Sequence, residues 1–122
     1  MTRSFILGIA GAFLLTVSAW AHHSHGNYNM TEYTILKGTI KEVHWLVPHS
    51  WVYLDVKNEK GEVDTWALEG SGSTQLLKQG WTKDMLKAGD SIAVRCHKLK
   101  DDSAGCLLGF ITTTDGTERT FD

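Results

Sequence analysis

Alternation of hydrophobic and polar residues predicts most of the secondary structure of this chain. In residues 51–57, WVYLDVK, Val52 and Leu54 point to one side of a strand while Trp51 and Tyr53 point to the other. Comparable alternation, or enrichment in β-branched residues, marks four further segments. The pattern therefore predicts five strands, at residues 34–45, 51–57, 62–70, 91–99 and 106–113.

The period changes between the third and fourth strands, where residues 71–81 carry Leu76 and Leu77 on one side of a short helix. Three strands, a helix and two strands is the element order of an OB-type barrel. We expect an all-β fold with a small α contribution, either a five-stranded OB-like barrel or an open β-sandwich. The predicted core comprises Val52, Leu54, Trp66, Leu68, Ile92, Val94, Leu108 and Phe110.

The first residues have the features of a secretory signal peptide. Arg3 precedes an uncharged run at residues 5–17, which is too short to span a bilayer, and Ala19-Trp20-Ala21 offers small residues at a cleavage site. We expect cleavage after Ala21, with a retained membrane anchor as the alternative. The division is a signal peptide at 1–21, a His-rich segment at 22–33 and a barrel domain at 34–122. The mature chain is expected to be periplasmic or secreted, with no stable membrane span.

The net charge of the mature chain limits the classes of partner that we expect. Loss of Arg3 leaves 11 basic against 14 acidic residues, a formal charge of −3, and no basic patch is visible. We therefore do not expect the chain to bind nucleic acid. The expected partner is a small ligand or a periplasmic protein.

Cys96 and Cys106 flank the sequence LKDDSAG, which is typical of a turn between two strands. An oxidising compartment permits a disulfide bond, and a hairpin would bring the two residues face to face. We favour the disulfide over the alternative of two buried thiols.

Several short motifs resemble one bacterial family. They are Ala21-His22-His23-Ser24, Lys37-Gly38-Thr39-Ile40, WLVPHSW at residues 45–51, Gly80-Trp81, LKAGD at 86–90 and the hairpin at 99–108. Together they resemble the small exported proteins of domain-of-unknown-function family 6152. The resemblance implies a compact exported β domain and no established activity. Val47 stands where the family usually has Asn before Pro-His, and Cys96 and Cys106 stand where small residues are expected.

Histidines at the processed start are the first candidate site. Cleavage after Ala21 would give His22 both a free α-amino group and an imidazole, so one residue could chelate a metal through two nitrogens. Copper(II) binds nitrogen donors most tightly among the divalent first-row ions. The arrangement resembles the histidine brace of copper mono-oxygenases. The third donor would be one of His23, His25, His44 and His49. The alternative is a solvated tail.

His44 and His49 flank a proline turn in the sequence HWLVPHSW. Their ring nitrogens could join a metal site. Alternatively, His49 donates to a backbone carbonyl and fixes the turn.

A ligand face of aromatic side chains is the third candidate, comprising Trp45, Trp51 and Tyr53. The surface of the second and third strands commonly holds the ligand in OB-type barrels. Cys96-His97 is not a nucleophilic pair, because adjacent strand residues point to opposite faces. We expect His97 to be a surface residue.

These observations give three hypotheses. The first is a non-catalytic periplasmic binding module that takes copper at its processed N-terminus. The second is an adaptor that binds through the aromatic face without metal. The third is a copper-dependent redox enzyme. No catalytic residues stand out.

Overall fold

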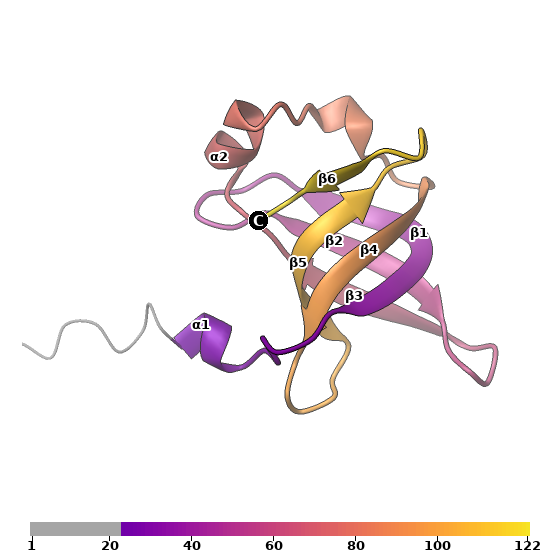
Figure 1. The fold of residues 1–122 in the computed structure, drawn as a ribbon. Helices are drawn as coiled ribbons and strands as arrows, with labels where there is room; N and C mark the ends of the chain where they lie inside the picture. Colours follow the sequence, from indigo (N-terminus) through magenta and orange to yellow (C-terminus); the bar gives the residue numbers. More distant parts are fainter. Residues whose placement is uncertain (1–22) are drawn as a thin grey trace, which may run out of the picture.

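The computed structural model of the protein describes residues 23–122 (Figure 1). Strands dominate it, and two α-helices and one 3-10 helix are short. The elements are α1 (His23–Gly26), β1 (Thr34–His44), β2 (Trp51–Lys57), β3 (Val63–Glu69), α2 (Ser73–Lys78), η1 (Lys83–Met85), β4 (Ser91–Lys98), β5 (Gly105–Thr112) and β6 (Glu118–Thr120). The five predicted strands and the helix between the third and fourth are confirmed.

The sheet closes into a barrel. Its strand order is β3-β2-β1-β4-β5-β6, and β3 also pairs with β5 in parallel. This last pairing joins the two ends of the five-strand set, so the barrel is the correct alternative and the open sandwich is wrong. β6, which the pattern did not predict, extends β5 on the outside of the closed ring.

The core lies inside this ring. Val52, Leu54, Leu68, Val94 and Leu108 are each at most 1% exposed. Ile92 is also buried, so six of the eight predicted core residues are confirmed. Trp66 only partly meets the prediction, because it is half-buried and packs against the edge of the core.

Phe110 is wrongly assigned to the core. Arg95 pairs with Phe110 but Cys96 pairs with Leu108, so Gly109 is an extra residue in β5. Such a bulge shifts the side-chain alternation by one position, and Ile111 takes the inward place instead. The Phe110 ring lies outside the barrel, 4.1 Å from the Arg95 guanidinium carbon.

Candidate functional site

Two neighbouring strands, β1 and β2, present predicted ligand residues on the outer wall of the barrel, and β3 lies beside them. In the register of the sheet, His44 of β1 lies opposite Trp51 of β2, and Trp51 lies opposite Glu69 of β3. Val52 and Leu54 are completely buried, so Trp51 and Tyr53, which alternate with them, face outward and are half-buried. We call His44, Trp51 and Tyr53 the aromatic face.

Trp45 points elsewhere. It is half-buried against the core, and its ring packs edge-on to Phe121 at a centroid distance of 6.1 Å. The aromatic face therefore contains two of the three predicted aromatic residues, with His44 in addition. The rings of His44 and Tyr53 meet edge to face at 5.1 Å.

The turn that carries His49 is held against the segment before α2. The Val47–Pro48 peptide bond is cis. Buried Ser50 donates its N–H to the Ser71 carbonyl at 3.0 Å, and its own carbonyl accepts the N–H of Gly70 at 2.9 Å. These backbone bonds fix the position of His49, whose side chain remains 44% exposed.

A buried carboxylate links this turn to the start of the described chain. The Tyr28 hydroxyl donates to Glu69 Oε2 at 2.6 Å, and Glu69 Oε1 lies 3.6 Å from His49 Nδ1. Tyr28 and Glu69 are 6% and 5% exposed. Burial, followed by the hydrogen bond to Glu69 and its charge, raises the pKa of the Tyr28 phenol above its ordinary range.

The two candidate imidazoles have similar surroundings. His49 Nδ1 lies 3.3 Å from the Gly70 carbonyl, as expected for a histidine that fixes the turn. His44 Nε2 lies 2.8 Å from Glu42 Oε2. Each ring therefore has one nitrogen held by an oxygen and the other left for a ligand, an arrangement also found around metal-binding histidines.

The family model described as "Family of unknown function (DUF6152)" matches residues 12–108, which is most of the chain. The chain belongs to this family. The resemblance drawn from the short motifs is thereby confirmed. Searches of the curated proteins and of the solved structures gave no significant match.

The DUF6152 match spans all of the candidate site residues, but it ends within β5. β6 and Phe121 lie beyond it, although Phe121 is completely buried and packs on Trp45 and Trp81. The matched region therefore includes the proposed binding residues but not all of the core that supports them.

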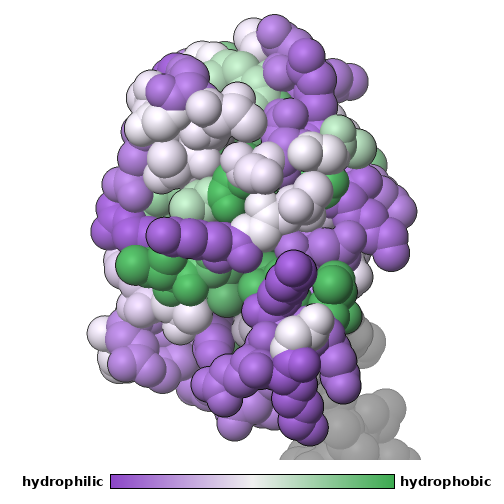
Figure 2. All heavy atoms as spheres, turned by 90° about the vertical axis from the view of Figure 1, so that its right-hand side faces the viewer, coloured by the Kyte–Doolittle hydropathy of each residue, from purple (hydrophilic) through white to green (hydrophobic). Residues whose placement is uncertain are grey.

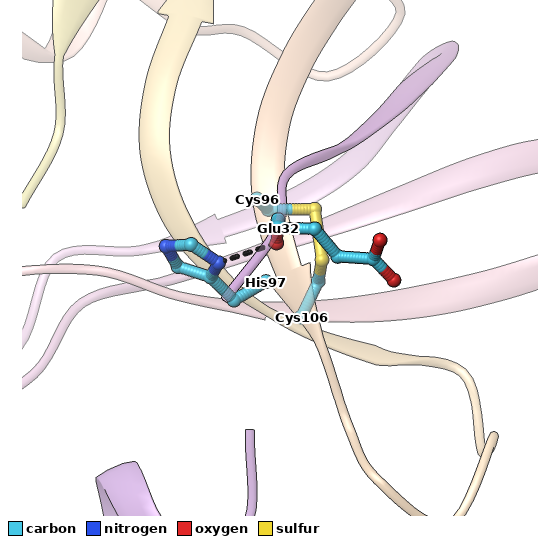
Figure 3. The surroundings of a disulfide bond; sticks show 4 residues. All are labelled: Glu32, Cys96, His97 and Cys106. Atoms are coloured by element: carbon cyan, nitrogen blue, oxygen red, sulfur yellow. Dashed lines mark hydrogen bonds between the residues drawn. A yellow bond between two sulfur atoms is a disulfide. The ribbon is translucent and has the colours of Figure 1, made fainter. Parts of the chain in front are cut away.

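The predicted disulfide is confirmed. Cys96 and Cys106 are bonded across a Cα–Cα distance of 5.6 Å and are completely buried (Figure 3). His97 points away from them, on the opposite side of β4. The expectation of a surface position for His97 is wrong, because its ring stacks on Tyr33 at 4.2 Å and its Nδ1 lies 2.7 Å from the Glu32 carbonyl. His97 is 8% exposed because the segment before β1 covers it.

The structure describes only some of the N-terminal histidines. His22 and the signal-peptide and cleavage predictions lie outside the described residues, as does the side chain of His23. His25 is exposed on α1. Within residues 25–122, no three His, Cys, Asp or Glu side chains are grouped closely enough to hold a metal ion. Across residues 23–122, no helix has the length and apolar character needed to cross a membrane.

Sequence reasoning missed Tyr28 and Glu69. Pairing residues 51–57 with 63–69 through the turn between them would have placed Glu69 opposite Trp51. Nothing in the local pattern indicates that Tyr28 crosses to Glu69, 41 positions away.

Proposed function

We propose that this DUF6152 chain is an exported, non-catalytic binding module that takes copper(II) at its processed N-terminus. The α-amino group and imidazole of His22 would provide two nitrogen donors. His49 would provide a third, with His23, His25 and His44 as the other candidate donors.

One observation carries this proposal: the chain of contacts from Tyr28 through Glu69 to His49. It anchors the N-terminal segment, six residues after His22, beside the turn that presents His49. Between His22 and Tyr28 lie the short helix α1 and Asn27, which together span only about 10 Å, so the processed terminus is tethered near the Tyr28–Glu69 contact.

The donor chemistry also supports copper. His49 is half-exposed, and when its Nδ1 donates to the Gly70 carbonyl, its Nε2 keeps a lone pair for a metal. Glu69, behind the ring, would stabilise the polarised imidazole. Nitrogen-rich sites favour copper(II) over the other divalent ions of the first transition row.

A calorimetric titration with copper(II) tests the proposal. The titration uses protein purified after export, and mass spectrometry first verifies that its N-terminus is His22. We expect tight binding of one copper ion per chain. The matched control is the same chain acetylated at the α-amino group of His22, which removes that nitrogen donor without adding a new one and should weaken binding at least about tenfold. Equal affinities for the two chains would contradict the proposal.

The aromatic face supports a second candidate function, an adaptor for a protein or an extended ligand. His44, Trp51 and Tyr53 come together there, and outward-facing, partly exposed aromatic side chains are common at binding sites. Under this candidate, Trp51→Ala abolishes partner capture and leaves the copper affinity unchanged. Loss of copper affinity in Trp51→Ala with no change in capture would count against it. Oxygen consumption by the copper-loaded chain above that of free copper would instead indicate a redox enzyme.

A further inference from the structure

We propose that the barrel carries a second ligand site, separate from the aromatic face, which binds a small planar organic anion. The site is a pocket of about 570 Å³ between the start of β1, the end of β2, the start of β3 and the end of β4. We call it the barrel mouth. The aromatic face and α2 adjoin the opposite ends of β1, β2 and β3.

The mouth exists because the barrel is incompletely closed. β3 pairs with β5 only over Ala67–Glu69, although its pairing with β2 begins at Val63. The earlier residues of β3 therefore border an opening rather than a neighbouring strand.

Side chains at this opening occupy positions that face the barrel interior. Trp66 lies two positions before buried Leu68 on β3, and Lys98 lies two positions after buried Cys96 on β4, so each shares the inward side of its strand. Leu36 and Val56 complete an apolar floor. Figure 2 shows the side of the molecule that lies on the right in Figure 1, with hydrophobic side chains exposed among long hydrophilic ones.

Lys98 gives the mouth its charge preference. Its ammonium lies 5.6 Å from the centre of the Trp66 ring. Among residues 25–122, no carboxylate forms an ion pair with it. Lys37 and Lys57 also line the mouth, against only Asp64 and Glu59. A half-buried cation without a counter-ion attracts an anion.

The disulfide restrains the backbone at the barrel mouth. In the register, Cys96 lies opposite Thr34 and Cys106 lies opposite Lys98, and both of these partners line the mouth. A rigid floor lowers the ordering cost of binding. The volume falls within the range typical of small-molecule pockets, which also occur at the mouths of β-barrels.

These features together specify the ligand class. An aromatic or other flat apolar body would lie on Trp66, Val56 and Leu36, and a carboxylate, sulfonate or phosphate would meet the Lys98 ammonium. The site requires neither the N-terminal histidines nor a metal ion.

Titration with 2-naphthoate, followed by ¹H–¹⁵N NMR in the presence of EDTA, tests the site. We expect saturable shifts at the Trp66 indole N–H and along the end of β4, with a dissociation constant below about 1 mM. The neutral 2-naphthamide should bind about tenfold more weakly, because it lacks the charge that Lys98 attracts.

Three lysine variants control the experiment. Lys98→Gln should lose the preference for 2-naphthoate over the amide, and Lys98→Arg should keep it. Lys83→Gln, in η1 near α2, should behave like the wild type. Equal binding of 2-naphthoate and 2-naphthamide, undiminished binding by Lys98→Gln, or absence of saturable shifts at the mouth would each overturn the proposal. Because EDTA removes copper, failure here leaves the N-terminal copper site standing.

Discussion

The two ends of this barrel are built from the same alternating strands but are finished in different ways. At the α2 end, Leu76, Trp81, Leu86 and Phe121 are at most 3% exposed and close the interior. The Trp81 indole N–H also donates to the Thr120 carbonyl at 2.8 Å. The α2 end is therefore sealed by aromatic and aliphatic packing.

At the barrel mouth, the inward positions are filled differently. Trp66 is half-buried, Lys98 brings a charge, and a covalent bond between Cys96 and Cys106 lies beside them. An inward position on a strand is therefore not always a core position. Its role depends on whether another element covers that end of the barrel.

Two tryptophan substitutions should show the largest difference in stability between the two ends of the barrel. Trp81→Ala should lower the free energy of unfolding by about 3–5 kcal/mol, because it empties a sealed part of the core. Trp66→Ala should cost less than about 2 kcal/mol, because water already reaches this side chain. Urea unfolding followed by circular dichroism measures both. Equal losses would show that the two ends are packed alike.

Removal of the disulfide should affect the mouth before the α2 end. Cys96→Ala with Cys106→Ala should cost about 2–3 kcal/mol, because it frees a short loop in the unfolded chain. Amide hydrogen exchange should accelerate first at the ends of β4 and β5 that meet at the hairpin. A reducing agent should reproduce the effect in the wild type and leave the double variant unchanged. Uniform acceleration across α2 and the mouth would contradict the comparison.

Removal of the hydrogen bond between Tyr28 and Glu69 should cause an intermediate loss of stability. Tyr28→Phe should cost about 1.5–2 kcal/mol, because it leaves a buried carboxylate without its donor. The pKa of Tyr28 is raised in the folded state, so its contribution is complete below the unfolded-state pKa near 10 and is lost as the pH rises further. Urea titrations between about pH 8 and 11 should show a steeper loss in the wild type than in Tyr28→Phe. Parallel losses would rule out this linkage.

The smallest loss of stability should follow from breaking an ion pair on the outer wall of the barrel, between its two ends. Arg95 pairs with Glu118 at 2.7 Å, and both side chains are well exposed. Glu118→Gln should be nearly indistinguishable from the wild type in urea unfolding, because water and salt screen such a pair. A large loss of stability would mean that the wall contributes as much as the packed end.

Local pattern predicts five of the six strands, the helix between β3 and β4, and the disulfide, because each depends on alternation or on a short turn. The choice between barrel and sandwich depends on the β3–β5 pairing, which joins distant segments. Phe110 was misplaced because one bulge residue, Gly109, reverses the alternation.

At the candidate site, too, local pattern predicts which way strand residues face but not the contacts between distant segments. Alternation predicts that Trp51 and Tyr53 face outward, but not that Trp45 turns toward Phe121. The covering of His97 and the contact of Tyr28 with Glu69 come from a segment whose own pattern predicts no regular element. Such contacts depend on the tertiary fold rather than on neighbours in sequence.

The measurement that most directly tests the proposed function is electron paramagnetic resonance of the copper(II)-loaded chain, with its N-terminus at His22, beside that of His49→Gln. We expect the wild-type spectrum to show at least three nitrogen donors and the spectrum of His49→Gln to lack one of them. Superimposable spectra would exclude His49 from the copper site and contradict the link between the N-terminus and the proline turn.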